Sequence, residues 1–440
     1  MSQPHAASAS VSTSVTVSPA RSIQGSLRLP GDKSISHRYA MLAGFAAGVS
    51  HLSNFSSGAD PHSTLACMQA LGASVEKQPD GALTITGCSG AFRQPQAPLD
   101  CGNSGSTMRM LAGLLAGQSI ACTLIGDASL SRRPMERIRT PLTAMGAEIS
   151  LTEGHAPITV RGGSLRGLDY ATPIASAQVK TALLFAGLQA SGTTTVHETV
   201  TTRDHGELAL RAFGAELTRQ SLSVSIRGSQ PLHAIDATIP GDISSAAFFL
   251  CAAALFPDAN LVLDSVGLNP TRAALLDVLR GLGLRINILD LNEAQGELTG
   301  TIQAVGNPLG LEGAEISGAL AAQLIDELPV LAAIAPYTRN GIRIRDAREL
   351  RVKESDRIAL VARNLRAMGA SVEEFEDGLD VPGGQTLHGA GIDSGDDHRI
   401  AMAFAVATLR AQGPSQISGA EAAAISFPEF FTWLDRLAER

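Results

Sequence analysis

The chain has 440 residues, of which 44% are hydrophobic but only 4% aromatic, so we expect an aliphatic core spread over two or three domains. Its 34 basic and 42 acidic side chains give a net charge of −8, which argues against nucleic acid as a partner, because binding a phosphate backbone needs a basic surface. The longest apolar run, residues 246–256, is shorter than the roughly 20 residues of a membrane helix, so we expect a soluble, cytoplasmic protein with no membrane partner.

Residues 1–20 are rich in Ser, Ala, Val and Thr and contain no acidic residue. They lack the cationic and then apolar order of a signal peptide, so a disordered tail is predicted. A transit peptide is a weaker alternative, because Arg21 is the only arginine near this segment.

One kind of predicted helix ends in an apolar residue followed by glycine. The first covers residues 61–71, with Asp60 as its N-cap, and a hairpin with strands at 74–78 and 83–86 follows it. The glycine stands where a helix end favours a left-handed residue. Gly72 follows this first helix, and the same arrangement recurs at Gly146, Gly214, Gly283 and Gly369.

Alanine-rich helices alternate with the first kind, and a short strand follows each of them. Together these elements predict a unit of about seventy residues, helix–strand–helix–strand–strand, that occurs six times. The sixth copy is expected to end at a C-terminal helix from Phe427. The alanine-rich helices are expected to begin near Lys33, Asn103, Ser176, Asp242, Leu324 and Asp397.

The tripeptide Pro-Gly-Asp at 30–32 returns at 240–242, three units later. Both copies could be ordinary turns before helices, but their spacing favours two crossovers between domains. We therefore expect a disordered tail at 1–20, a discontinuous first domain at 21–31 plus 242–440, and a second domain at 32–241.

Basic residues stand repeatedly at the starts of the predicted helices. Each alone could be a solvated helix residue, but a cation near a helix N-terminus is unfavourable unless an anion binds there. The pattern therefore predicts a compact polyanionic small molecule as ligand. These residues are Lys33, Arg38, Arg109, Arg133, Arg203, Lys353, Arg357 and Arg399.

Two carboxylates stand among these cations. Asp326 occurs in an apolar stretch at a predicted helix start, and Glu354 lies between Lys353 and Arg357. An N-cap and a helical ion pair are the ordinary interpretations. The functional interpretation is acid–base catalysis on a bound substrate.

Motifs for cofactors, metals and covalent catalysis are absent from the sequence. It contains no phosphate-binding Gly-rich loop, no dinucleotide fingerprint and no nucleophile elbow. The five cysteines form no Cys-x-x-Cys pair, so free thiols, no metal and no cofactor are expected. This combination favours transfer from a simple phosphorylated metabolite.

Four long segments resemble the 5-enolpyruvylshikimate-3-phosphate synthase family: PGDKSISHR at 30–38, GNSGSTMR at 102–109, RELRVKESDR at 348–357 and DDHRIAM at 396–402. The resemblance implies an α/β (α+β) fold of two globular domains, each of three βαβαββ repeats, joined by a double-crossover hinge. It also implies transfer of the enolpyruvyl group of phosphoenolpyruvate to the 5-hydroxyl of shikimate 3-phosphate, with release of phosphate, by a monomer.

The resemblance also implies a role for each matching residue. Asp326 would accept the hydroxyl proton, Glu354 would exchange a proton with the methylene carbon, and Lys33 would assist both substrates. Shikimate 3-phosphate would contact Lys33, Ser34, Arg38, Ser176, Ala177, Gln178, Arg203, Asp326 and Lys353. Phosphoenolpyruvate would contact Lys33, Gly105, Arg133, Gln178, Arg357 and Arg399.

Two alternatives remain. A sister transferase that acts on UDP-N-acetylglucosamine shares the fold, but it should carry a reactive cysteine in a Gly-Cys-x-x-Gly-x-Arg-Pro-like loop, which this sequence lacks. A non-catalytic repeat scaffold is the other. The resemblance further implies that glyphosate inhibits at Gly105, since insensitive members of a similar branch carry alanine there. Ile425 stands where many members have a lysine, so we assign no role to it.

Overall fold

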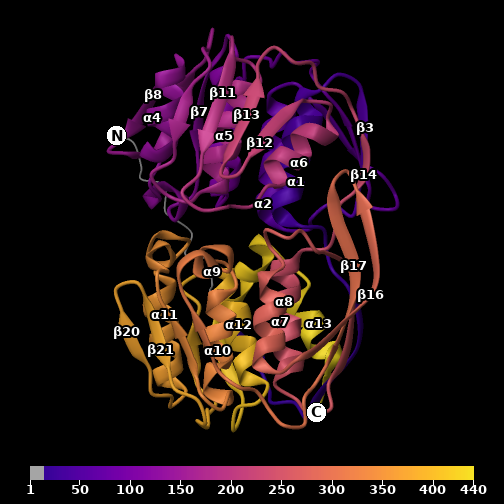
Figure 1. The fold of residues 1–440 in the computed structure, drawn as a ribbon, viewed down its shortest axis with the longest axis vertical. Helices are drawn as coiled ribbons and strands as arrows, with labels where there is room; N and C mark the ends of the chain where they lie inside the picture. Colours follow the sequence, from indigo (N-terminus) through magenta and orange to yellow (C-terminus); the bar gives the residue numbers. More distant parts are fainter. Residues whose placement is uncertain (1–13) are drawn as a thin grey trace, which may run out of the picture.

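The computed structural model describes residues 14–440, and its buried apolar side chains form two separate cores. One core contains only residues between 35 and 239, and we call this part the insert lobe. The other combines residues 17–29 with residues 243–437, and we call it the flanking lobe. Figure 1 shows the insert lobe, coloured indigo to pink, above the flanking lobe, whose later part is orange and yellow.

The insert lobe consists of three helix–strand–helix–strand–strand units, each with a further short strand at its end. The first unit contains α1 (Lys33–Phe45), β3 (Val49–Ser53), α2 (Ala59–Ala70), β4 (Ser74–Lys77), β5 (Leu83–Thr86) and β6 (Leu99–Asp100). The second contains α3 (Gly105–Ala116), β7 (Ala121–Ile125), α4 (Glu136–Met145), β8 (Glu148–Thr152), β9 (His155–Arg161) and β10 (Asp169–Ala171). The third contains α5 (Ala177–Gly187), β11 (Thr193–His197), α6 (His205–Ala212), β12 (Leu217–Gln220), β13 (Ser223–Arg227) and β14 (Asp236–Thr238).

The last strand of each unit joins the sheet of another unit. In the insert lobe, β6 pairs in parallel with β7, β10 pairs in parallel with β11, and β14 returns to pair in parallel with β3. The hairpins then extend these sheets antiparallel, which gives the orders β14-β3-β5-β4, β6-β7-β9-β8 and β10-β11-β13-β12. The three units therefore form a closed ring, with α1, α3 and α5 packed inside it.

The flanking lobe repeats this plan with three more units. The fourth unit contains α7 (Ile243–Ala254), β15 (Asn260–Gly267), α8 (Ala274–Leu282), β16 (Arg285–Ala294), β17 (Glu297–Val305) and β18 (Ala314–Ile316). The fifth contains α9 (Gly318–Gln323), α10 (Leu328–Ile334), β19 (Ile342–Ile344), α11 (Arg357–Ala367), β20 (Glu373–Phe375), β21 (Gly378–Val381) and β22 (Gly391–Asp393). The sixth contains α12 (His398–Thr408), β23 (Ser415–Ser418), α13 (Phe430–Leu437) and β24 (Ala438–Glu439), and the N-terminal segment adds β1 (Ser14–Val17) and β2 (Ser22–Arg28).

The N-terminal segment corrects one prediction. Ser14–Val17, part of the tail expected to be disordered at 1–20, forms strand β1 and pairs antiparallel with β23, and Val17 is buried in the flanking core. The sixth unit has no hairpin of its own, so β1 occupies the sheet position that a hairpin strand takes elsewhere. Residues 18–20 are described and form neither helix nor strand, and residues 1–13 of the predicted tail lie outside the described residues.

Two further helix predictions were wrong in detail. The helix expected from Phe427 begins at Phe430, after a 3-10 segment at residues 420–425. The helix expected near Leu324 is divided into α9 and α10, and residues 324–327 form a turn between them. Asp326 therefore lies in a turn between two short helices instead of at the first position of one.

The two Pro-Gly-Asp segments lie side by side, as their interpretation as crossovers requires. Gly31 and Gly241 form an antiparallel bridge, the Asp32 amide donates to the Pro240 carbonyl at 2.7 Å, and the Asp242 amide donates to the Pro30 carbonyl at 3.1 Å. A Cβ on Gly31 would lie 1.8 Å from the Asn54 carbonyl oxygen, so only glycine fits this crossing.

The equivalence of the two lobes explains this repeated tripeptide. In the flanking lobe β2 pairs in parallel with β15, just as β14 pairs with β3 in the insert lobe. Each of these ring-closing strands ends directly before a Pro-Gly-Asp crossover. The predicted glycines at helix ends are also confirmed, for example Gly146 with φ +115° and Gly283 with φ +112°.

The lobes also touch away from the crossovers. The long hairpin β16–β17 rises from the flanking lobe toward β14 of the insert lobe (Figure 1), and the Gln295 side chain donates to the Asp236 carbonyl at 3.3 Å. Beside the turn at the tip of this hairpin, His205 Nδ1 lies 2.6 Å from Glu297 Oε1, and both side chains are buried. In the described part of the chain, no helix is long and apolar enough to cross a membrane.

Candidate functional site

Helices from both lobes begin at one place between the lobes. Their first turns are capped by side chains that accept a backbone N–H, at Asp32, Ser104 and Ser176 in the insert lobe and at Asp242 and Asp397 in the flanking lobe. The remaining free N–H groups and the positive ends of the helix dipoles favour anions there. The ring architecture thus makes an anion-binding region from residues that are far apart in the sequence.

A cavity of about 550 Å³ lies where these helices begin. Both lobes line it, and it brings together all but one of the residues predicted from the sequence to form the site. Those lining it are Lys33, Ser34, Arg38, Gly105, Arg133, Ser176, Ala177, Gln178, Arg203, Asp326, Lys353, Glu354 and Arg399. Arg357, the remaining residue, lies behind the two carboxylates.

Asp326 is surrounded by four cations. Its carboxylate lies 2.6 Å from Arg203 Nη2, 3.5 Å from Arg357 Nη1, 3.6 Å from Arg399 Nη2 and 3.9 Å from Lys353 Nζ. Burial alone would raise the pKa of this carboxyl, but the four positive charges hold it well below the usual value of 3.8. Asp326 is therefore ionised at neutral pH, and a proton acceptor is available in the site.

Glu354 occupies a similar environment on the side of the cavity formed by α3 and α11. Arg357 Nη2 donates to it at 2.7 Å, and Arg133 Nη1 of the insert lobe lies 3.5 Å away. Burial raises the pKa of this carboxyl, but the positive charges of Arg357, Arg133 and Lys33 lower it well below 4.5. The backbone carbonyl of Glu354 also accepts from Ser129 of the insert lobe at 3.0 Å.

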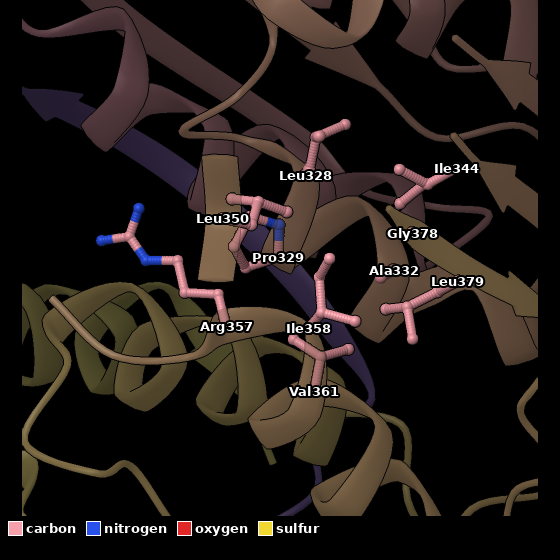
Figure 2. A pocket seen from close by; sticks show the side chains of 10 residues that line it. All are labelled: Leu328, Pro329, Ala332, Ile344, Leu350, Arg357, Ile358, Val361, Gly378 and Leu379. Carbon is pink, nitrogen blue, oxygen red and sulfur yellow. The ribbon is translucent and has the colours of Figure 1, made fainter. Parts of the chain in front are cut away.

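Arg357 supports both carboxylates from a buried position. Figure 2 shows its stem beside the apolar side chains of Leu350 and Ile358, with the guanidinium pointing away from them. Nε donates to Asp397 at 2.8 Å and Nη2 to Glu354 at 2.7 Å. Its Nη1 is buried, makes no hydrogen bond among residues 14–440 and lies 3.5 Å from the Asp326 carboxylate.

Lys33, the first residue of α1, is held by an unpredicted partner. Its Nζ lies 2.5 Å from the carboxylate of Asp60, and both side chains are largely buried. The prediction that Asp60 caps a helix was wrong: Gly58 is the residue before α2, and Asp60 lies inside the first turn. The aspartate instead provides a counter-ion for the lysine, and sequence spacing gave no indication of this pair.

Arg38 and Arg109 occupy the second turns of α1 and α3. Arg38 donates to the Ser34 carbonyl at 2.8 Å and to Thr181 at 3.0 Å, and burial lowers its pKa to about 10. Arg109 donates to the Gln178 side chain at 2.6 Å. Burial, with Arg137 and Arg133 nearby, lowers the pKa of Arg109 to about 9. Both arginines therefore remain charged at neutral pH.

Several residues that were not predicted to belong to the site also line the cavity. Arg109 was recognised as a cation at a helix start, and its spacing one turn after Gly105 could have placed it there. Arg137 and Glu349 form a 2.8 Å ion pair between the two lobes, and no sequence signal indicated it. His398, at the start of α12, has a pKa well below 6.5 because of burial and the nearby Lys33, so it is neutral at pH 7.

The cysteines lie away from this chemistry. All five fall within the described residues and are free, and none lines the cavity. Burial raises the pKa of Cys122 to about 12, so it is a poor nucleophile at neutral pH. Among residues 14–440 no group of three or more His, Cys, Asp and Glu side chains is arranged to hold a metal ion.

Comparison with known proteins agrees with this geometry. Curated relatives called 3-phosphoshikimate 1-carboxyvinyltransferase include one from Koribacter versatilis, 61% identical over 97% of this chain and 100% of the relative. Another, from Solibacter usitatus, is 53% identical over 96% of this chain and 99% of the relative. A solved EPSP synthase from Acinetobacter baumannii superposes with a TM-score of 0.85 at 39% identity, covering 97% of this chain and 98% of that one.

The structural likeness confirms the predicted α/β fold of two three-unit lobes joined by a double crossover. The family described as EPSP synthase (3-phosphoshikimate 1-carboxyvinyltransferase) matches residues 17–434. The chain therefore belongs to the EPSP synthase family.

Proposed function

We propose that the cavity between the lobes transfers the enolpyruvyl group of phosphoenolpyruvate to the 5-hydroxyl of shikimate 3-phosphate and releases phosphate. The observation that carries this proposal is the position of two carboxylates, Asp326 and Glu354, within one cluster of cations. Both substrates are anions, so bringing them together needs a dense positive lining. Each carboxylate can then move a proton at a different substrate.

The cavity lining supports a separate position for each substrate. We assign shikimate 3-phosphate to Lys33, Ser34, Arg38, Ser176, Ala177, Gln178, Arg203, Asp326 and Lys353. We assign phosphoenolpyruvate to Lys33, Gly105, Arg133, Gln178, Arg357 and Arg399. The hydrogen bond from Arg109 to Gln178 supports this division, because it holds the Gln178 side chain at the junction of the two groups.

In the first stage Asp326 accepts the proton of the 5-hydroxyl as that oxygen forms a bond to carbon 2 of phosphoenolpyruvate. Glu354 takes up a proton as the bound anions raise its pKa, and it then supplies this proton to convert the methylene group to methyl. In the second stage the bond from carbon 2 to the phosphate oxygen breaks, and Glu354 takes a proton back from the methyl group. Lys33 stabilises the charge that develops on the departing phosphate.

Substrate binding prepares both carboxylates for these steps. Without substrate, the surrounding cations hold the pKa values of Asp326 and Glu354 well below their usual range, which makes each a weak base. A bound phosphate or carboxylate group takes up much of this positive charge. The pKa values of both carboxyls then rise toward the range where proton transfer is effective.

Residues 32–241 and residues 21–31 plus 242–440 are the two domains of this proposal, which their separate cores support. The ion pairs Arg203–Asp326 and Arg133–Glu354 cross between the lobes, so closure of the domains would assemble the site and exclude water. We propose a cytoplasmic monomer. One chain supplies the whole lining, and five free thiols fit a reducing compartment.

Calorimetry combined with a phosphate-release assay tests the proposal. We expect shikimate 3-phosphate to bind alone, and phosphoenolpyruvate to bind more tightly in its presence. Phosphate release should require both compounds. Release with UDP-N-acetylglucosamine in place of shikimate 3-phosphate would contradict the assignment, and binding without any release would favour a non-catalytic role.

A further inference from the structure

A buried lysine lies just behind the proposed shikimate 3-phosphate position. Lys180 is on α5, one turn after Ser176, and its side chain has no solvent exposure. Its Nζ lies 3.0 Å from Glu198 Oε2 and 2.8 Å from Glu207 Oε1. Replacing a buried ion pair with apolar side chains is often neutral or stabilising, so stability alone does not account for a charged group here.

Glu198 links this lysine to the cavity. Its second oxygen, Oε1, accepts the backbone N–H of Thr202 at 3.1 Å and also the Thr202 hydroxyl. Residues 198–204 join β11 to α6 without helix or strand structure. Their backbone is therefore not fixed by a regular hydrogen-bond ladder, and the Glu198 carboxylate supplies a fixed acceptor in its place.

The residue that follows Thr202 is Arg203, which reaches across the gap between the lobes. Its Nη2 donates to Asp326 at 2.6 Å, although the two residues belong to different lobes. A guanidinium on an irregular segment would otherwise sample many positions, because arginine has several rotatable bonds. Holding the backbone one residue earlier restricts where this guanidinium can point.

We propose that Lys180 and Glu198 are positioning residues for Arg203. Lys180 fixes the orientation of the Glu198 carboxylate, Glu198 fixes Thr202, and Thr202 directs Arg203 toward Asp326 and the substrate phosphate. The inference rests on the proposed role of Arg203 in binding shikimate 3-phosphate. It adds two residues that do not line the cavity and whose side chains are buried in the insert lobe. Lys180 belongs to α5, which is labelled in Figure 1.

Glu207 provides a matched control. It is as deeply buried as Glu198 and pairs with the same lysine, but it lies on α6. Its Oε2 has no hydrogen-bond partner among residues 14–440, and its Oε1 contacts Lys180 and Arg219. Glu207→Gln therefore disturbs the same ion cluster and leaves the group that holds Thr202 unchanged. In Glu198→Gln the one remaining acceptor oxygen faces Lys180, so the amide NH2 group turns toward the Thr202 N–H.

The test measures KM for each substrate, together with Tm, in Glu198→Gln and Glu207→Gln. We expect both variants to lose similar stability, but only Glu198→Gln to raise KM for shikimate 3-phosphate, by about tenfold, with a smaller change for phosphoenolpyruvate. If Glu198→Gln does not fold, Glu198→Asp keeps the charge beside Lys180 but is one methylene shorter, and it should show the same KM defect. Equal KM changes in the Glu198 and Glu207 variants would overturn the inference.

A double-mutant cycle separates this inference from the proposed function. If Glu198 acts through Arg203, then Glu198→Gln should have little further effect on kcat/KM in an Arg203→Ala background. Additive effects would overturn the positioning role while leaving the role of Arg203 intact. An unchanged KM for shikimate 3-phosphate in Arg203→Ala alone would instead overturn the role of Arg203, and the inference with it.

Discussion

Asp326→Asn tests the proposed proton acceptor most directly. The amide keeps the shape of the side chain and can still accept the 2.6 Å hydrogen bond from Arg203, but it cannot take a proton at neutral pH. Loss of a general base typically costs about 10²- to 10⁴-fold in rate, equivalent to about 3–5 kcal/mol of activation free energy. We expect kcat to fall by about this factor.

Substrate affinity should respond differently from turnover. Two unit charges at the 3.9 Å separation of Asp326 and Lys353 attract by about 4 kcal/mol at an effective dielectric constant near 20, before desolvation offsets most of it. Removing the carboxylate leaves this positive charge for an incoming phosphate to neutralise. We therefore expect shikimate 3-phosphate to bind Asp326→Asn as tightly as wild type, or more tightly.

Steady-state phosphate release at saturating substrates and calorimetric titration with shikimate 3-phosphate measure the two effects separately. Asp346→Asn is the matched control, because this carboxylate also lines the cavity but accepts a hydrogen bond from the Gly318 amide at 2.8 Å. Turnover of Asp326→Asn within about threefold of wild type would refute its role as base and leave it only as a counter-ion.

Three further predictions concern Lys33, Gly105 and the pH dependence of stability. Lys33→Met should lower kcat/KM for both substrates at least about 100-fold in the phosphate-release assay, because it removes a cation from both positions; a tenfold loss or less would contradict this. Wild type should be inhibited by glyphosate in competition with phosphoenolpyruvate, and Gly105→Ala should weaken the inhibitor more than the substrate. The new Cβ would lie 3.0 Å from Arg109 Nη1 and 3.4 Å from Arg133 Nη1; equal losses for both ligands would oppose this reasoning. Because the folded-state pKa of Asp326 is depressed below 3.8, its contribution to stability is present above about pH 4 and lost as pH falls through the folded value. Below about pH 4, the free energy of unfolding measured by denaturant titration should thus change less with pH in Asp326→Asn than in wild type. Identical slopes of this free energy against pH in the two proteins would contradict the prediction.

Features that depend on local backbone geometry could be predicted from the sequence. Gly146 and Gly283 follow helices with φ above +110°, a conformation that glycine adopts readily, so their spacing revealed the repeat. The Pro-Gly-Asp pairs revealed the crossovers because a ring-closing strand ends before each one. The cations at helix starts were also recognisable, since each is unfavourable there without an anion.

Features that depend on distant partners could not be predicted in this way. Asp60 has the sequence context of a helix cap, and only the packing of α2 against α1 makes it the partner of Lys33. The turn that contains Asp326 interrupts a stretch whose apolar pattern favours a continuous helix. β1 needs β23, which is about four hundred residues away in the sequence, before its pairing can form.

The ring-closing strand β2 has a consequence for the order in which this chain can fold during synthesis. Ser22–Arg28 leaves the ribosome directly after β1, but its parallel partner β15 begins at Asn260 and its other neighbour, β24, at Ala438. The whole insert lobe is made in the interval, and its three sheets need no strand from outside residues 49–238. The insert lobe can thus mature while β2 waits unpaired, and the exposed edges of that early strand are the segment that a chaperone would have to protect from aggregation.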